Sequence, residues 1–322
     1  MMSIQHLLEI THLKKTFVVN RGMFSPKIFV KAVDDVSFNV IKSESFGIVG
    51  ESGCGKTTIG RLLVRLTQPT NGTVHFENEE LFSMSRKQFR KKQCELQMIF
   101  QDPFASLNPR IPVGRIIGEP LAVHGIGNAS ERRKAVEELL EIVGLKRSFY
   151  KRYPHEFSGG QRQRICIARA LVLKPKVIVA DEPVSALDVS IQSQILNLMR
   201  NLQKELGLTY IFISHDLSVV KHFCNRIAVM YLGKFVETAS KVDLYRSPLH
   251  PYTQSLLSAI PVPDPAANRN RIVLTGDVPS PANPPSGCSF HTRCPKAMDI
   301  CSKKLPVLRN MAETHQVACH LY

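Results

Sequence analysis

The sequence predicts an α/β protein whose sheet is largely parallel, and two observations carry this prediction. Short β-branched runs alternate with helical segments along much of the chain, and such alternation is typical of parallel sheets covered by helices. A glycine-rich loop at residues 50–57 joins a predicted strand to a predicted helix. The length of 322 residues is enough for about two domains with real hydrophobic cores.

The first hundred residues predict strands and one helix. β-branched runs between turn residues indicate strands at 7–13, 31–41, 46–49 and 73–76. Apolar side chains at helical spacing indicate a helix at 59–66, directly after the glycine-rich loop. The order strand, glycine loop, helix is the context in which such loops bind phosphate.

The middle of the chain changes to helical character between about residues 102 and 173, which we interpret as a helical insert. Within it, Ser130 is the expected N-cap of a helix that Gly144 ends. Strand patterns return at 177–180, 210–213 and 227–231, and a helix with Ile195, Leu198, Met199 and Leu202 on its apolar face lies between the first two.

Beyond about residue 247 the chain is rich in proline, which favours an extended, irregular tail. The prolines are Pro261, Pro263, Pro265, Pro279, Pro281, Pro284 and Pro285. Four of the eight cysteines also lie in this tail.

Charge and hydropathy exclude several classes of protein. The longest apolar runs are far shorter than the roughly 18 residues of a membrane helix, and no export signal is visible, so we expect a cytoplasmic chain. The net charge of +15 fits a phosphate-rich partner. The basic residues are scattered, without aromatic interleaving, and this disfavours nucleic acid.

Residues 50–57 match G-x-x-x-x-G-K-[ST], the phosphate-binding loop. Its backbone N–H groups and the dipole of the following helix attract phosphate oxygens. Lys56 would reach the β- and γ-phosphates of a nucleotide, and the Thr57 hydroxyl would bind Mg²⁺.

Two further patterns supply catalytic chemistry and a second anion site. The apolar strand at 177–180 ends in Asp181, expected to hold Mg²⁺, and Glu182, expected to polarise the attacking water. Residues 158–161, Ser-Gly-Gly-Gln, open a helix whose N-terminus forms a second anion site. The phosphates of a nucleotide bound by this chain already occupy the loop at residues 50–57. The second anion site is therefore expected to bind a nucleotide held by another subunit.

The order of these motifs resembles that of the ATP-binding subunits of ABC transporters. In that family a Walker A loop, a Q-loop glutamine, the LSGGQ signature, Walker B with its glutamate, a D-loop and a switch histidine follow one another. Here they correspond to residues 50–58, Gln101, 157–161, 177–182, 185–188 and His215. Phe157 replaces the usual leucine of the signature, an apolar exchange outside the glycine turn.

The resemblance implies a P-loop NTPase (RecA-like) core with an N-terminal antiparallel β subdomain, a helical signature subdomain and an irregular, Cys-rich C-terminal extension. It implies catalytic roles for Glu182, His215 and Gln101, and Mg²⁺ ligation through Thr57, Gln101 and Asp181. Phe17 is the expected adenine-stacking residue, although Phe24 and Phe29 lie nearby and core packing is the commoner fate of phenylalanine. The ATP-binding residues implied are Phe17, Gly50, Glu51, Ser52, Gly53, Cys54, Gly55, Lys56, Thr57, Thr58, Gln101, Ser158, Gly159, Gly160, Gln161, Asp181 and Asp188.

Residues 101–110, residues 250–253 and the cysteine-containing tail resemble the dipeptide/oligopeptide importer ATPases. Residues 287–291 and 317–320 are most similar to the second ATPase of the importer pair. This resemblance implies an ATPase domain at 1–246 and an extension at 247–322. Its implied partners are a second, homologous ATPase subunit, two transmembrane permease subunits and, indirectly, a substrate-binding protein. The implied location is the cytoplasmic face of the inner membrane, and the cargo is dipeptides or oligopeptides, with nickel or another small solute as the alternative.

Cys288, Cys294, Cys301 and Cys319 are separated by 5, 6 and 17 residues, and four thiolates suffice for a zinc site or an iron–sulfur cluster. The spacing matches neither standard pattern, so zinc, an iron–sulfur cluster and unmetallated thiols all stay open on the residues alone. His291, His315 and His320 are substitute ligands for zinc. The resemblance favours a [4Fe–4S] cluster.

Two other functions compete with transport. A soluble ABC ATPase acting on ribosomes or DNA would suit the positive charge, but such proteins usually carry two nucleotide domains or a long coiled coil, and this chain shows no sustained heptads. A nucleotide-sensing regulator that barely hydrolyses ATP is disfavoured because Glu182 and His215 are both present.

Overall fold

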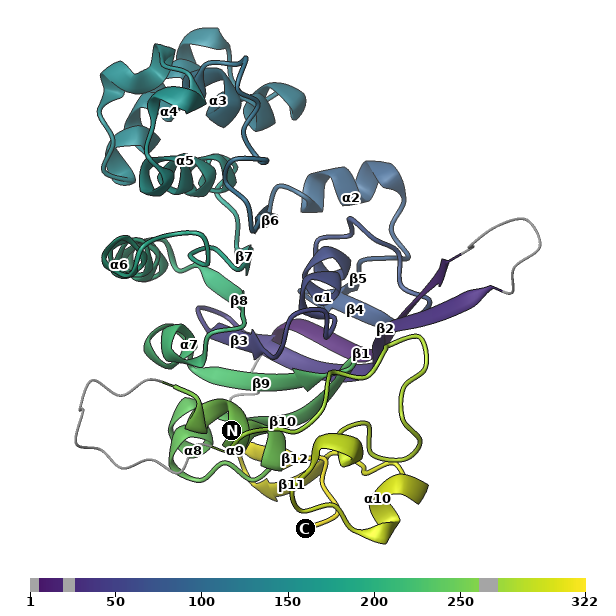
Figure 1. Ribbon diagram of the computed structural model, residues 1–322. Coiled ribbons are helices and arrows are strands. Elements are labelled where there is room, and N and C mark those ends of the chain that lie inside the picture. Colours follow the sequence, from purple (N-terminus) through teal and green to yellow (C-terminus); the bar gives the residue numbers. More distant parts are fainter. Residues whose placement is uncertain (1–5, 20–26, 261–271) are drawn as a thin grey trace. The chain divides into compact units, whose positions relative to one another are not determined.

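The computed structural model describes residues 6–19, 27–260 and 272–322 (Figure 1). The chain forms two compact units. Unit 1 comprises residues 1–41, 45–82 and 214–322, and unit 2 comprises residues 42–44 and 83–213. The boundary between ATPase domain and extension that the sequence predicts near residue 246 stays a prediction.

An antiparallel sheet with strand order β2-β1-β4-β5 forms the N-terminal part of unit 1. Its strands are β1 (His6–Val19), β2 (Ile28–Ile41), β4 (Asn71–Phe76) and β5 (Glu79–Glu80). In the first half of β1, Leu8 and Ile10 are buried whereas Glu9 and Thr11 are exposed. This alternation places one face of the sheet in the core.

A second group of strands in unit 1 carries the phosphate loop. β3 (Ser45–Val49) pairs in parallel with β9 (Arg226–Tyr231), which pairs antiparallel with β10 (Lys234–Ser240). Every residue of β3 is buried, as is typical of a strand covered on both faces. The loop connects β3 to α1 (Lys56–Leu63), which is held in place by its buried Ile59, Leu62 and Leu63.

The chain beyond β10 adds helices and two strands to unit 1. The helices are α8 (Lys241–Arg246), α9 (Pro251–Ser258) and α10 (Asp299–Lys303), and α7 (Leu217–Phe223) precedes them. β12 (His315–Val317) pairs antiparallel with β10, and β11 (Arg309–Ala312) pairs with β12. The expectation of an irregular extension is therefore wrong for these segments, because β12 satisfies backbone groups that β10 would otherwise leave unpaired.

The irregular part of the extension is the stretch at 272–290, which contains Pro279, Pro281, Pro284 and Pro285 and forms no helix or strand. Pro261, Pro263 and Pro265, which the sequence also predicts to lie in an extended segment, are outside the described residues. The extended character follows the prolines, which lack an N–H for helix or sheet pairing.

A buried carboxylate anchors the extension to β10. Glu237 accepts hydrogen bonds from the backbone N–H groups of Leu249 (2.8 Å) and His250 (2.9 Å), and its Oε1 lies 2.7 Å from His315 Nε2. Glu237 is 0% exposed, so these partners replace the water that a carboxylate otherwise requires. The network joins β10, the start of α9 and β12.

Unit 2 contains three parallel strands in the order β8-β7-β6. They are β6 (Leu96–Ile99), β7 (Val177–Asp181) and β8 (Thr209–Ser214). The helices are α2 (Arg86–Lys92), α3 (Val113–Val123), α4 (Ala129–Ile142), α5 (Gly159–Leu171) and α6 (Val189–Leu206), with short 3-10 turns η1 (Arg147–Lys151) and η2 (Pro154–Glu156). Helices α3 to α5 lie within the helical insert predicted at 102–173.

The start of α4 corrects one prediction. Asn128, not Ser130, is the N-cap: its side chain accepts hydrogen bonds from the N–H groups of Ser130 and Glu131, both at 3.0 Å. The Glu131 carboxylate accepts the Asn128 N–H in return, at 2.7 Å. This reciprocal capping box satisfies more backbone donors than a cap at Ser130 would, and Gly144 follows the helix in a left-handed conformation (φ 78°), as predicted.

No helix among residues 6–19, 27–260 and 272–322 has the combination of length and hydropathy that a membrane span requires.

Candidate functional site

The phosphate loop ends in a conformation that only glycine fits well. Gly55 caps α1 with φ 111°, and a Cβ atom placed there would lie 2.0 Å from the carbonyl oxygen of Ala32. Lys56 and Thr57 are therefore the first two residues of the helix, where N–H groups point toward the loop. The sequence pattern placed this loop correctly between a strand and a helix.

The side chain of Lys56 is folded into the loop. The residue is 4% exposed, and its ammonium group donates hydrogen bonds to the carbonyl oxygens of Gly50 (2.7 Å) and Glu51 (2.9 Å). These contacts fix a positive charge at the N-terminus of α1, where the helix dipole adds to it. An anion such as a nucleotide phosphate is the group that this arrangement attracts.

The pair Asp181 and Glu182 lies at the end of β7 in unit 2. Asp181 is 2% exposed, whereas Glu182 is partly exposed and has a left-handed backbone (φ 46°). The amide of Gln101 donates a hydrogen bond to the Glu182 carboxylate at 3.0 Å. The structure thus brings together two of the three predicted catalytic residues.

The turn at residues 158–161 starts α5 as predicted. Ser158 is the N-cap, its hydroxyl accepting the Gln161 N–H at 3.4 Å, and the Gln161 side chain accepts the Ser158 N–H at 3.1 Å. A Cβ atom at Gly160 would lie 2.6 Å from a methyl group of Ile191 in α6, so glycine allows the two helices to approach. Ser158 itself is exposed.

The remaining predicted residues lie at exposed positions. His215 follows β8 and is exposed, and Asp188 is the exposed residue that precedes α6. Phe17, in β1, is 40% exposed, and the ammonium group of Lys15 lies 5.0 Å from the centre of its ring. Phe17 is thus not a core residue, and the Lys15 ammonium group lies over its ring, whereas Phe24 lies outside the described residues.

The predicted residues divide between the two units. Unit 1 carries Phe17, the loop residues Gly50 to Thr58 and His215, and unit 2 carries Gln101, Ser158, Gly159, Gly160, Gln161, Asp181, Glu182 and Asp188.

Sequence reasoning missed two residues that contact the loop from the C-terminal extension. The Tyr252 hydroxyl accepts the backbone N–H of Glu51 at 2.9 Å, and the guanidinium of Arg293 forms two hydrogen bonds with the Glu51 carboxylate. Both residues lie in stretches that the sequence singled out, at 250–253 and beside Cys294, but nothing in the pattern links them to a loop more than 200 residues away.

The four cysteines of the extension are neighbours in the fold. Burial, followed by the charges of Cys301, Cys319 and Cys294, raises the pKa of the Cys288 thiol to about 11. Each sulfur also has a backbone N–H group beside it. The N–H of Phe290 lies beside Cys288, that of Lys296 beside Cys294 and that of Leu321 beside Cys319. The N–H of Met298 lies 3.5 Å from the sulfur of Cys301.

Burial is the larger effect and raises the pKa of Cys288, Cys294 and Cys319, and the N–H groups oppose this rise by favouring the thiolate, the form of cysteine that binds metals. Four cysteines are the donor type that zinc and iron–sulfur clusters take. In the part of the chain that the structure describes, however, no three His, Cys, Asp or Glu side chains are arranged as a metal-holding group. The thiols are close to one another without forming a closed coordination shell.

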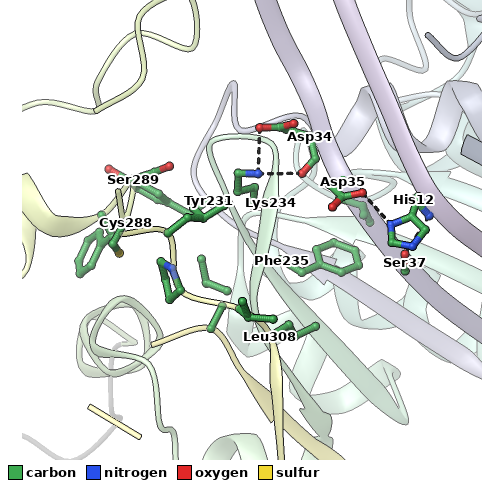
Figure 2. Close-up of a pocket in the computed structure, with 17 residues that line it drawn as sticks. His12, Asp34, Asp35, Ser37, Tyr231, Lys234, Phe235, Cys288, Ser289 and Leu308 are labelled. Carbon is green, nitrogen blue, oxygen red and sulfur yellow. Dashed lines mark hydrogen bonds and ion pairs between the residues drawn. The ribbon is translucent and has the colours of Figure 1, made fainter. Parts of the chain in front are cut away.

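A cavity of about 260 Å³ lies beside Cys288 (Figure 2). Phe235 and Leu308 form part of its apolar wall. On its polar side, Lys234 Nζ lies 2.9 Å from Asp34 Oδ2, and His12 Nδ1 lies 2.9 Å from Asp35 Oδ1. The charged groups of this cavity thus form ion pairs with one another. The phosphate loop differs, because its Lys56 ammonium group contacts backbone carbonyl oxygens.

Comparison with known families and proteins agrees with the motifs. Residues 33–185 match the ABC transporter family, and residues 236–301 match the family described as the oligopeptide/dipeptide transporter C-terminal region. The oligopeptide transport ATP-binding protein AppF of Bacillus subtilis is 57% identical over 320 residues, which cover 98% of this chain and 97% of that protein.

Solved structures show the same fold. A dimeric ATP-binding cassette in a post-hydrolysis state, bound to ADP and Pi, is 29% identical, with a TM-score of 0.64 over 73% of this chain and 98% of that one. CbiO1 from Clostridium perfringens, part of an ABC transporter complex, is 28% identical with a TM-score of 0.64, covering 76% of this chain and 92% of that one.

Proposed function

The chain belongs to the ABC transporter ATP-binding subunits of the oligopeptide/dipeptide import family, and from this premise we propose how its residues use ATP to energise peptide import. The observation that supports the proposal most strongly is the ammonium group of Lys56, held inside a glycine loop at the start of α1. A buried cation at the N-terminus of a helix is suited to the β- and γ-phosphates of ATP.

The loop binds the nucleotide and the end of β7 supplies the chemistry. Mg²⁺, when bound, neutralises charge on the phosphates, and Thr57, Asp181 and Gln101 are the residues that would hold it. Glu182 accepts a proton from the attacking water, with Gln101 and His215 orienting the carboxylate and the water. The hydrogen bond from Gln101 to Glu182 at 3.0 Å supports this pairing. Phe17 stacks on the adenine.

The turn at residues 158–161 acts on the nucleotide of a second ATPase subunit. The turn begins α5 with an exposed serine and three partly exposed residues, and the N-terminus of this helix favours an anion. One nucleotide fills the phosphate loop of this chain, so the turn is available to a nucleotide held by the other subunit. The second subunit is a homologous chain, which makes the assembly a heterodimer of which this chain is the second member. The dimeric state of the cassette solved with ADP and Pi supports a pairing of two ATPase subunits.

The complete transporter includes two transmembrane permease subunits, to which the ATPase pair attaches at the cytoplasmic face of the inner membrane. A separate binding protein delivers the substrate. The name of the Bacillus subtilis relative supports oligopeptides as the cargo of this chain. Dipeptides and nickel are the alternatives that an uptake measurement distinguishes.

Cys288, Cys294, Cys301 and Cys319 hold a [4Fe–4S] cluster, with zinc as the alternative. The N–H groups beside the four sulfurs support a thiolate-ligated group, and the cluster would cross-link segments of the extension. Anaerobic purification followed by iron, sulfide and zinc analysis is expected to give about four irons and four sulfides per chain. Zinc alone, or metal-free chains with a native melting temperature, would overturn the cluster.

Uptake into cells tests the function. Cells carrying the native chain are expected to accumulate a labelled oligopeptide, and cells carrying Lys56→Ala are expected to lose this uptake because the phosphate loop loses its cation. A labelled dipeptide and Ni²⁺, measured in parallel, identify the cargo. Equal uptake of all three by both cell lines would contradict the proposal.

A further inference from the structure

Arg293 lies in η3 (His291–Arg293), one residue before Cys294, and it contacts the phosphate loop. We infer that Arg293 is a positioning residue for this loop, so that nucleotide affinity depends on the C-terminal extension. The inference rests on the proposed role of residues 50–57 in binding ATP. It adds a residue, more than 200 positions away, that acts on the nucleotide through Glu51.

The contact is a two-pronged ion pair. One terminal nitrogen of Arg293 lies 2.7 Å from Glu51 Oε2 and the other lies 3.1 Å from Glu51 Oε1. The two parallel bonds fix the direction of the carboxylate as well as its distance, which a lysine could not do. The side chain of Arg293 is 8% exposed and that of Glu51 is 27% exposed, so water competes weakly for the pair.

Each polar group of Glu51 has a separate partner. Its carboxylate is bound by Arg293, its N–H donates to the Tyr252 hydroxyl at 2.9 Å, and its carbonyl oxygen accepts from Lys56 at 2.9 Å. Two of these three partners belong to the extension. The third is the lysine that we propose binds the phosphates, so the extension and the phosphate-binding cation hold the same residue.

Tyr252, one of the two partners from the extension, packs in a cluster of aromatic rings, and Arg293 lies beside the same cluster. The rings of Tyr231, Tyr252 and Phe290 pack together with centroid distances of 4.8, 5.2 and 5.3 Å, and all three are almost fully buried. Burial raises the pKa of the Tyr231 phenol, and nearby Arg293 opposes this shift, which places the guanidinium against the same cluster. A rigid aromatic cluster thus supports both contacts to the loop.

A loop with three glycines needs such support. Gly50, Gly53 and Gly55 give residues 50–55 the backbone freedom that the phosphate site requires, and ordering a glycine costs more conformational entropy than ordering other residues. Contacts that fix the loop before the nucleotide arrives remove that cost from the binding step. Arg293 therefore raises affinity without touching the nucleotide.

The test is calorimetric titration of the full chain with MgADP, which engages the loop and is not hydrolysed. Arg293→Ala is expected to weaken binding about tenfold, within the range of coupling found between contacting groups. Lys296→Met is the matched control: it removes a positive charge from the same segment, and its ammonium group contacts Gln254 and not the loop. It is expected to bind MgADP within about twofold of the native chain.

Glu51→Ala separates positioning from simple electrostatics. Removal of a negative charge near the phosphates would by itself tighten MgADP binding. A positioning role predicts the opposite, a weakening similar to that of Arg293→Ala. The double variant is then expected to bind no more weakly than the weaker single variant, because the two residues act as one unit. Thermal melting of each variant checks that it is folded.

The result that overturns the inference differs from the one that overturns the proposed function. If Lys56→Ala weakens MgADP binding while Arg293→Ala and Glu51→Ala, both folded, bind as the native chain does, Arg293 does not position the loop. Tighter binding of MgADP by Glu51→Ala would also overturn the positioning role. If Lys56→Ala binds MgADP with native affinity, the assignment of the phosphate loop itself is wrong.

Discussion

At the scale of single residues, Glu182 shows how the fold holds a reactive group in an uncommon conformation. Its backbone is left-handed (φ 46°), a region that costs a residue with a side chain roughly 1–3 kcal/mol. The Glu182 N–H donates to the Ile213 carbonyl at 2.9 Å and its carboxylate accepts from Gln101 at 3.0 Å. These two contacts fix both ends of the residue, so the carboxylate has a defined direction at the end of β7.

This geometry leads to a prediction for Glu182→Gln. Glutamine has nearly the same shape but cannot accept a proton from water, so phosphate release is expected to fall by about 10²–10³-fold. The affinity for MgATP is expected to stay within a few fold of native, because no loop contact is lost. Phosphate release and equilibrium binding measured on the same preparation check both parts. Hydrolysis within twofold of the native rate would remove Glu182 from its proposed role.

At the scale of elements, the start of α9 contains a buried, neutral histidine. His250 is 1% exposed, and its Nδ1 accepts the Tyr252 N–H at 3.1 Å as the helix cap. Burial lowers the pKa of His250 to about 3, so the folded chain keeps it neutral. In the unfolded chain the imidazole gains a proton below about pH 6.5. Acid therefore favours unfolding between about pH 6.5 and 3.

His250→Asn tests this linkage, because asparagine caps a helix well but does not titrate. In the native chain, lowering the pH from 7 to 5 is expected to cost about 2 kcal/mol of unfolding free energy through this residue. In His250→Asn that part of the loss is expected to be absent. Urea unfolding at pH 7 and pH 5 measures the difference. Equal losses in the two proteins would show that His250 is not the titrating group.

Local sequence patterns predicted the elements that residues close in the sequence determine. They failed for elements that form only by pairing with a segment far away in the sequence. The strand that ends at Val49 and the helix that Ser158 caps were both placed correctly because hydrophobic run, glycine and cap lie within a few residues. The strands at 309–317 were missed because β12 exists through its pairing with β10. The bond between Arg293 and Glu51 was missed for the same reason.

At the scale of the whole molecule, the functional residues are shared between two compact units, and part of the proposed site belongs to another chain. Unit 1 holds the phosphate loop and unit 2 holds Glu182 and the turn at residues 158–161. The proposal that this turn serves the partner's nucleotide makes ATP the link between subunits. Association of the ATPase pair should therefore require both a filled loop and an intact turn.

Ser158→Asp is designed to break only that link. Aspartate caps a helix as well as serine does, but it places a negative charge where the partner's phosphate would bind. MgATP-driven pairing with the second ATPase subunit is expected to be lost, while MgATP affinity of the isolated chain is unchanged. Asn128→Asp, the same change at the cap of α4, is the control and is expected to pair normally. Sedimentation with and without MgATP reads the outcome, and normal pairing of Ser158→Asp would contradict the composite site.

The central claim is that hydrolysis at Glu182 drives peptide import, and one measurement tests it most directly. The transporter is reconstituted into vesicles with this chain native or carrying Glu182→Gln, and ATP hydrolysis and uptake of a labelled oligopeptide are followed together. The account predicts ATP-dependent uptake with the native chain, and loss of both hydrolysis and uptake with the variant. Undiminished uptake by the Glu182→Gln transporter would contradict it.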